Sequence, residues 1–475
     1  MKNYVNLILV FITILHAAIF ASVWQISDEA TTPIRTYAAP EYSDVCMSAR
    51  WDHSSDPNDP VGAVGDFHAT RMEWCYTTDS NFIQACKNAG IDKFNCAISS
   101  PMPSDYQYNE SGTIRDSNGN SVTAPWMQGW DYWFGCCNNP IHRAKVLDLM
   151  KDCIDAGAYS LQFDDYRVNH HAVDWGGCYC SSCVSPAVTP QNETLVRSYY
   201  DYLQTQINNY AGGTVRFSCN NYRGEWNYST IEDGMFYIGV GEIPLPEGDD
   251  PSHLYEWAQY YAANSKAQIQ TLVSDHYLKN RRWIGFSYAI GVNPIVPWDV
   301  FIPGEPRFFG LPGSYAHMYG FVRGVADYLN GYEDAYALGT DISDDRFWSK
   351  KPVYKYNTTG DVYLMVRGKP GQDSADVVVH IVEWEDCTDA NYKIRLDRGR
   401  MFGSDSANLS VKFYRPYGYN QTAHDQAQST GDFSGLVQSW SKTVTYVGVS
   451  ADIYMSATDL DGYRPWGFLV VHKEP

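Results

Sequence analysis

The sequence is poor in basic residues: 35 Lys and Arg stand against 55 Asp and Glu, a formal net charge of −20 at pH 7. No basic patch could easily offset a field of that sign, so we expect no nucleic-acid partner. No candidate strand is followed by a Gly-rich phosphate loop, which makes an open doubly wound sheet the weaker alternative for the fold. The Gly-x-Ser-x-Gly motif of serine hydrolases is also absent,.

Long apolar runs are equally scarce, because only the N-terminus carries one. Lys2 precedes the run Val5–Ile19, and small residues up to Ala21 offer a cleavage site,. The run is short for a membrane span, and His16 interrupts it. We therefore expect residues 1–21 to be a signal peptide and the mature protein to be secreted, periplasmic or extracellular, without a membrane span.

The rest of the chain is organised in two parts. From about residue 46 to residue 330, short β-type runs alternate with helical patterns, which is typical of a parallel sheet with crossover helices. The expected strands are 45–51, 70–76, 93–98, 159–163, 215–219, 235–240, 269–273 and 294–298. This order predicts an α/β fold, a (β/α)8 TIM barrel over residues 22–340. After about residue 345 only strands follow, which predicts an all-β sandwich domain over residues 345–475.

Three of the 12 cysteines are packed into the six residues from Cys178 to Cys183. A disulfide would use at most two of these thiols, whereas a structural zinc ion binds four thiolates at about 2.3 Å. The fourth ligand would be Cys136 or Cys137 in the long loop before. Four thiolates leave no open coordination position, so such a metal would be structural. The alternative is two half-cystines with a third, unpaired thiol.

The stretch from Cys136 to Pro140, followed by a helix, by Gln162-Phe163-Asp164-Asp165 and by Cys178-x-Cys180-x-x-Cys183, resembles glycoside hydrolase family 42, the β-galactosidases. The order of elements is similar over roughly residues 70 to 300. The resemblance implies that four cysteines bind Zn²⁺ and that Cys137 is no ligand. These implied ligands are Cys136, Cys178, Cys180 and Cys183.

The sequence departs from that family at the end of the fourth strand. The family has Asn-Glu there, and its Glu is the acid/base, but this chain reads Asp164-Asp165-Tyr166. The resemblance therefore does not imply β-galactosidase activity.

Glycoside hydrolysis needs two carboxyl groups that flank the bond, and barrel enzymes carry them at the C-terminal ends of strands. Asp164 and Asp165 follow the fourth strand, Glu242 the sixth and Asp275 the seventh. Adjacent residues in a strand point to opposite sides, so only one of the two aspartates can reach the axis directly. We expect Asp165 to be the acid/base and Asp164 to orient it. The resemblance points to Asp275 as nucleophile, with Glu242 as the alternative.

Other side chains on the same side of the predicted barrel suit substrate binding. Aromatic residues make up 15% of the chain, and tryptophans stack well on sugar rings. The expected platforms are Trp126, Trp130, Trp133, Trp175, Trp226 and Trp298. Four polar residues are expected to bind substrate as well, and the last three could hold an acidic sugar: Asp299, Arg167, His170 and His171. We expect Arg71 and Glu73, within the second strand, to pair in a structural role.

These features predict a secreted glycoside hydrolase that cleaves a poly- or oligosaccharide by a retaining, two-carboxylate mechanism with a structural Zn²⁺. A non-catalytic carbohydrate-binding barrel is the first alternative, because the fourth strand lacks the family's Glu. A polysaccharide lyase is the second alternative, because Tyr166 or His170 could act as its base,.

Overall fold

The structure is a computed structural model, and it describes only part of the chain. The described residues are 40–51, 59–99, 101–103, 111–123, 132–164, 178–183, 193–220, 236–244, 251, 254–255, 267–273, 276–297, 309–337, 352–356, 361–372, 375–384 and 391–475. All structural statements below concern these residues.

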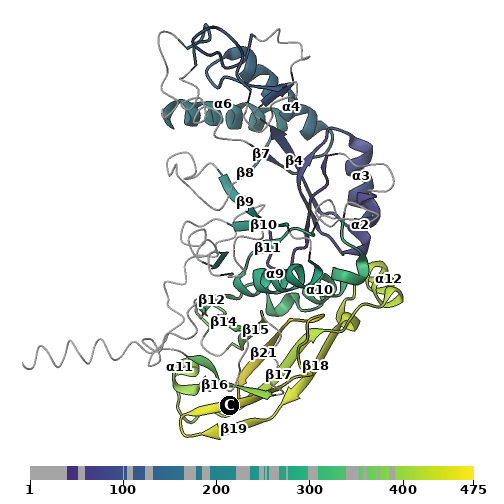
Figure 1. Cartoon of the computed structure of the whole chain (residues 1–475), viewed down its shortest axis with the longest axis vertical. Coiled ribbons are helices and arrows are strands. Elements are labelled where there is room, and N and C mark those ends of the chain that lie inside the picture. The colour runs from purple at the N-terminus through teal and green to yellow at the C-terminus, as the bar shows by residue number, and fades with distance from the viewer. Residues whose placement is uncertain are drawn as a thin grey trace, which may run out of the picture.

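Parallel strands form a sheet in the order β1-β3-β4-β7-β8-β9-β10-β11 (Figure 1). Their bounds are β1 Cys46–Met47, β3 Arg71–Tyr76, β4 Lys93–Ser99, β7 Ser160–Asp164, β8 Phe217–Asn220, β9 Phe236–Pro244, β10 Ala267–Val273 and β11 Asn293–Pro294. Strand β2 (Arg50–Trp51) continues the line of β1 alongside β3. The sheet closes on itself, because Cys46 pairs in parallel with Ile295, directly after β11. The predicted eight-stranded barrel is confirmed.

Helices follow the strands where their capping residues predict them. Helix α3 (Ser80–Ala89) begins after Asp79, whose carboxylate accepts from two backbone N–H groups, and it ends at Gly90 with φ 141°,. The remaining barrel helices are α2 Pro60–Asp66, α4 Pro140–Asp155, α6 Glu193–Ala211, α9 Tyr277–Ile290 and α10 Pro312–Gly324, then the short helix η4 Ala326–Tyr328. No helix in the described part of the chain is both long enough and apolar enough to cross a membrane.

The strands have an apolar outer face and a polar inner face. Phe94 of β4 meets Phe82 of α3 with ring centroids 6.0 Å apart, and Phe163 of β7 meets Tyr200 of α6 at 5.0 Å. The residues that alternate with these are buried but polar: Asn95, Ser160, Gln162 and Ser218,. Barrel interiors are ordinarily filled with Val, Ile and Leu. Polar interior residues on three neighbouring strands, β4, β7 and β8, therefore need a physical explanation.

Two antiparallel sheets follow the barrel. The first has six strands in the order β12-β14-β15-β21-β17-β18, and the second has four in the order β13-β16-β20-β19. Their bounds are β12 Glu333–Ala337, β13 Val353–Tyr356, β14 Val362–Gly368, β15 Val377–Glu383, β16 Asn391–Asp397, β17 Leu409–Pro416, β18 Val437–Lys442, β19 Val444–Val447, β20 Ser450–Ser456 and β21 Trp466–Lys473. Three short helices connect these strands along the chain. Helix α11 (Arg398–Phe402) follows β16, and α12 (Gln421–Thr430) and η6 (Ser434–Leu436) lie in sequence between β17 and β18.

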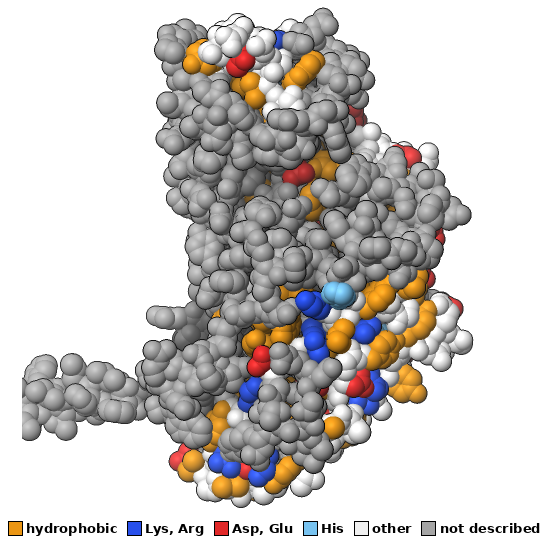
Figure 2. All heavy atoms as spheres, viewed as in Figure 1, with side chains coloured by type: hydrophobic (Ala, Val, Ile, Leu, Met, Phe, Trp, Pro, Cys, Tyr) orange, Lys and Arg blue, Asp and Glu red, His pale blue; other side chains and the backbone are white. Residues whose placement is uncertain are grey.

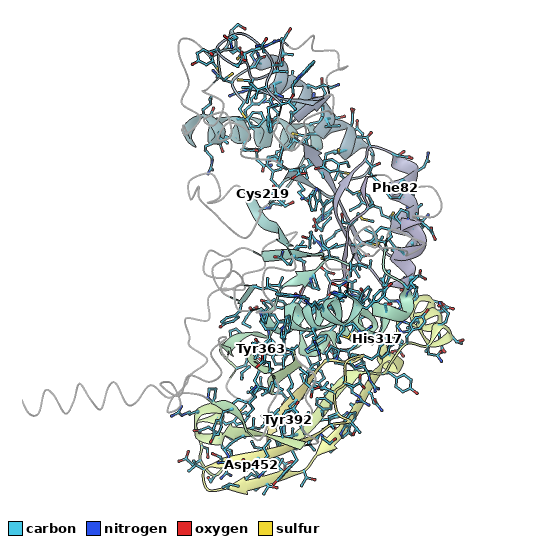
Figure 3. All side chains as sticks on the ribbon, viewed as in Figure 1. Phe82, Cys219, His317, Tyr363, Tyr392 and Asp452 are labelled. Carbon is cyan, nitrogen blue, oxygen red and sulfur yellow. The ribbon has the colours of Figure 1, made fainter. Side chains whose placement is uncertain are left out.

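The six-stranded sheet is buried on both faces. Leu364 and Ile381 belong to a core shared with the four-stranded sheet. Tyr363 and Trp466 belong instead to the core of the barrel, where Trp466 packs edge-on against Phe321 of α10 at 5.1 Å. Tyr363, labelled in Figure 3, packs edge-on against Phe286 of α9 with ring centroids 5.5 Å apart. The barrel and the C-terminal sheets thus share one continuous apolar contact.

Lys and Arg side chains gather over the C-terminal sheets on the face shown in Figure 2. Two cations of the C-terminal sheets contact exposed tyrosines: Lys393 Nζ is 4.7 Å from the ring centre of Tyr454, and Arg398 is 4.7 Å from that of Tyr446. Arg398 is itself buried, and its guanidinium donates to the carbonyls of Val449, Ala407 and Gly448.

Candidate active site and cysteine cluster

Asp164 ends β7 at the C-terminal side of the barrel, where active sites of this fold lie,. Its side chain is half-buried, and its Oδ2 accepts a hydrogen bond from the hydroxyl of Tyr76, the last residue of β3. Trp74 Nε1 donates in turn to the Tyr76 hydroxyl at 3.3 Å. The carboxylate is therefore held by a short chain of hydrogen bonds that starts two strands away in the sheet.

A β-bulge in β3 directs Tyr76 toward Asp164. Met72 pairs with Phe94 and Cys75 with Cys96, so two residues of β3 oppose a single residue of β4. Trp74 lies in this bulge with φ 51°, a left-handed conformation that costs a non-glycine residue about 1–3 kcal/mol,. Ser48 Oγ fixes it by donating to the Trp74 carbonyl at 2.9 Å.

The bulge changes which residues face the barrel axis. Strict alternation from Arg71 and Glu73 would place Cys75 inside and Tyr76 outside. The extra residue reverses this, so that Cys75 lies in the buried core and the Tyr76 hydroxyl reaches Asp164. Bulges are over-represented beside active sites, where they re-aim a side chain. Sequence reasoning missed Tyr76 because no glycine marks the bulge.

The expected pair of Arg71 and Glu73 is present, and it belongs to a larger network. Arg71 Nε is 2.7 Å from Glu73 Oε1, and both side chains are fully buried. Asn95 Nδ2 donates to the same carboxylate oxygen at 2.6 Å, and Asn95 Oδ1 accepts from Ser160 Oγ. Burial raises the pKa of Glu73, while Arg71 and Asn95 lower it. The network therefore fills the barrel interior on the N-terminal side of Asp164.

Glu242 lies within β9, which runs on to Pro244, and it does not follow the strand as the sequence suggested. Its backbone pairs with Thr271 of β10. Strand β10 ends at Val273, two residues before the predicted nucleophile Asp275. Strands β9 and β10 thus end beside each other, with Pro244 paired to Val273.

Most of the other predicted site residues lie outside the described residues, so their roles stay predictions: Asp165, Asp275, Trp126, Trp130, Trp175, Trp226, Trp298, Asp299, Arg167, His170 and His171. Trp133 is described, and it lies in β6 (Tyr132–Phe134), which pairs with β5 (Pro101–Pro103).

Four cysteines form the buried cluster that the sequence suggested: Cys136, Cys178, Cys180 and Cys183. The Sγ atom of Cys136 lies 3.5 Å from that of Cys183 and 3.6 Å from those of Cys178 and Cys180. Four sulfurs at about 2.3 Å from a central ion would lie about 3.8 Å from one another, whereas disulfide sulfurs lie about 2.05 Å apart. The donor set and its spacing fit a tetrahedral metal site.

The neighbouring Cys137 takes no part in the cluster. It packs in the barrel core, and burial raises the pKa of its thiol to about 12. Within the cluster, hydrogen bonding with Cys136 lowers the pKa of Cys178 to about 7. None of the cysteines in the described ranges forms a disulfide.

The cysteine cluster has little apolar core of its own. Among the described residues, Ile114, Val122 and Phe134 alone accompany the four cysteines in its hydrophobic contacts. Backbone hydrogen bonds connect the segments, such as Ile114 N to Phe134 O at 2.7 Å and Tyr179 N to Arg115 O at 2.9 Å. So small a core rarely holds loops in place without a metal or a disulfide. The four thiols could therefore hold a metal such as zinc.

The fold matches solved structures of glycoside hydrolases. An α-amylase from Anoxybacillus aligns over 93% of this chain and 99% of its own with a TM-score of 0.56 at 9% identity. A noncanonic maltogenic α-amylase from Thermotoga neapolitana aligns over 91% and 99% with a TM-score of 0.50, also at 9% identity. No family model matches the sequence, and no curated protein matches it. The chain therefore has the fold of TIM-barrel glycoside hydrolases, followed by C-terminal antiparallel sheets.

Proposed function

We propose that this protein is a glycoside hydrolase that cleaves a poly- or oligosaccharide with two carboxyl groups at the C-terminal ends of its barrel strands. The observation that carries the proposal is Asp164. It ends the fourth strand of a closed barrel, its side chain is half-buried, and Tyr76 orients it. A fixed carboxylate at this position is what glycosidic bond cleavage needs.

The roles within the aspartate doublet follow from the strand geometry. Asp164 continues the inner face of Ser160 and Gln162, so it is the member of the doublet whose side chain points toward the axis,. The prediction that Asp165 is the acid/base therefore competes with a direct role for Asp164. The second carboxylate would come from Glu242 or Asp275, and a retaining enzyme would place the two carboxyl groups about 5–5.5 Å apart.

The first experiment measures release of reducing ends from a panel of neutral and acidic polysaccharides that includes α-glucans. The proteins compared are wild type, Asp164→Asn and Asp165→Asn. We expect wild type to cleave at least one polymer and the catalytic variant to lose at least about a hundredfold in kcat/KM. Binding of sugar without cleavage by wild type would instead support a non-catalytic carbohydrate-binding barrel.

Aryl glycosides of the cleaved sugar then separate the roles. A variant without the general acid keeps activity toward a good leaving group such as dinitrophenolate, because that group needs no protonation. A variant without the nucleophile loses activity toward both kinds of substrate. If Asp164→Asn and Asp165→Asn both keep full activity toward the natural substrate and toward the aryl glycoside, the assignment of catalysis to the end of β7 is contradicted.

We further propose that the metal held by the cysteine cluster is Zn²⁺ in a structural role. Four thiolates are a common structural zinc set and leave no position open for substrate. The family-42 resemblance of the sequence implies the same ligands. We also propose that the protein is exported, on the basis of its N-terminal sequence.

A further inference from the structure

Gln162 is a fully buried polar side chain on the inner face of β7. Neither its Oε1 nor its Nε2 has a hydrogen-bond partner within the part of the chain that the structure describes. A buried amide left unpaired costs about 1–3 kcal/mol, and most buried polar side chains are paired for that reason. An exception two residues before a candidate catalytic carboxylate calls for a functional explanation.

The neighbours of Gln162 fix the direction in which it points. Phe163, the next residue, packs on Tyr200 of α6 outside the barrel, so Gln162 faces the axis,. Strand register places Ala97 of β4 on one side of it and Ser218 of β8 on the other. Ala97 has no polar side-chain atom, and Ser218 Oγ has no partner among the described residues either.

The layers above and below differ from this one. Asp164 lies about 7 Å closer to the C-terminal end of the barrel, two residues along the strand. On the other side, Asn95 uses both atoms of its amide, one with Glu73 and one with Ser160. Both amide atoms of Asn95 are thus paired within the structural network, whereas both amide atoms of Gln162, next to Asp164, are unpaired among the described residues.

We propose that Gln162, with Ser218 beside it, binds hydroxyl groups of the sugar residue whose bond is cleaved at Asp164. This inference rests on the proposed glycosidase function. A primary amide donates through Nε2 and accepts through Oε1, so it can engage two adjacent hydroxyls of one sugar ring. A site that hydrogen-bonds a substrate hydroxyl discriminates strongly against a sugar that lacks it. Gln162 is therefore a specificity-determining residue.

The test compares Gln162→Met with the matched control Gln204→Met. Gln204 on α6 is an amide whose Nε2 donates at 2.5 Å to the carbonyl of Val215, before the start of β8. We expect Gln162→Met to unfold at the same or a higher temperature than wild type, because no hydrogen bond is lost. Its kcat/KM on the best-cleaved oligosaccharide of the panel should fall at least about tenfold. Gln204→Met should show the reverse: a lower unfolding temperature and unchanged kcat/KM.

Monodeoxy forms of the released sugar, used as competitive inhibitors, identify the contacted hydroxyl. The monodeoxy sugar that lacks the contacted hydroxyl should inhibit wild type and Gln162→Met equally. The parent sugar should inhibit wild type more strongly than Gln162→Met. Equal kcat/KM for wild type and Gln162→Met would overturn the inference and leave the proposed function intact. Destabilisation of Gln162→Met as large as that of Gln204→Met would also overturn it, because the role would then be structural. Failure of wild type to cleave any polymer overturns the proposed function itself.

Discussion

At the scale of single residues, the hydroxyl of Tyr76 is the group that connects the strained bulge to the candidate catalytic carboxylate. Trp74 donates to Tyr76, and Tyr76 donates to Asp164. A chain of this kind holds an acidic side chain in one rotamer, and it needs the bulge to bring the phenol to the correct face of β3.

We predict that Tyr76→Phe lowers kcat by about tenfold to a hundredfold, the range that loss of a hydrogen bond to a charged group implies. The fold should stay intact, because the ring is retained. Tyr392→Phe is the matched control: its hydroxyl donates to Glu383 at 3.1 Å inside the C-terminal sheets. It should cost stability without changing kcat. Steady-state kinetics and thermal unfolding of both variants check this, and equal kcat for Tyr76→Phe and wild type would refute it.

The buried pair of Arg71 and Glu73 gives a prediction about stability. Removing one partner of a fully buried ion pair leaves an uncompensated charge and typically costs about 3–5 kcal/mol. Arg71→Met should therefore lower the free energy of unfolding by roughly that amount,. Adding Glu73→Gln to Arg71→Met should recover part of the loss, because the unpaired charge disappears. Urea unfolding of the single and double variants measures this, and a double variant no more stable than Arg71→Met would speak against it.

At the scale of elements, α9 and β21 approach each other only because Gly285 has no side chain. A Cβ atom built on Gly285 would lie 2.4 Å from Cβ of Trp466. Gly285→Ala must therefore shift the helix or the strand, and we expect a loss of about 1–3 kcal/mol. Gly65→Ala in α2 is the control, because nothing lies within 4 Å of its added Cβ. Chemical denaturation should show Gly65→Ala at least as stable as wild type.

A second contact between elements is a chain of side-chain hydrogen bonds from α12 to the barrel. Gln428 Nε2 donates to the Ala89 carbonyl at 3.0 Å, so its Oε1 accepts from His68 Nδ1 at 2.7 Å. His68 Nε2 must then accept from His424 Nδ1, also at 2.7 Å. This arrangement excludes the doubly protonated pair, because a proton on His68 Nε2 would then face the N–H of His424,. A single added proton keeps the hydrogen bond but places a charge on a buried ring,.

Acid should weaken this contact. Burial and the neighbouring His68 lower the pKa of His424 from 6.5 to about 4, and burial lowers that of His68 despite nearby Asp66 and Asp425. The unfolded chain therefore binds protons first, and the stability that the neutral pair provides is lost as the pH falls from about 6.5 to about 4. Glu383, whose pKa burial raises to about 7, acts in the opposite direction.

The opposing contribution of Glu383 is present in both wild type and His424→Gln, so a comparison of their pH profiles removes it. The decrease of the unfolding midpoint between pH 6.5 and pH 4 should be smaller in His424→Gln than in wild type. Thermal melts at several pH values measure the difference, and parallel profiles for the two proteins would exclude the His68–His424 contact as a cause.

At the scale of the whole molecule, the order and type of the barrel elements could be read from the sequence. Helix α3 lies between Asp79 and Gly90, residue types that favour the two ends of a helix,. The details of the site could not be read in the same way. The bulge at Trp74 has no glycine to signal it, and α12 forms its barrel contact through His68, more than three hundred residues away. Both depend on distant parts of the chain.

The cysteine cluster predicts a metal dependence confined to one part of the molecule. Wild type should contain about one zinc per chain by elemental analysis, and Cys178→Ser should contain much less, whereas Cys137→Ser should retain it. Removing the metal should increase proteolysis near residues 111–183, because the cluster has so little apolar core,. Cleavage confined to the barrel strands instead would contradict a local role.

The seam between Cys46 and Ile295 has a consequence for how the chain is made. Only after Ile295 has left the ribosome can β1 find its last neighbour, whereas all four clustered cysteines have emerged by residue 183. Any sheet that the first strands form before that point would be open, and its inner side could face water at little cost, since it carries Asn95, Ser160 and Gln162. An apolar interior would be prone to aggregate during the same interval. The polar side chains on the inner face of the sheet therefore also suit a barrel whose last pair of strands forms late in synthesis.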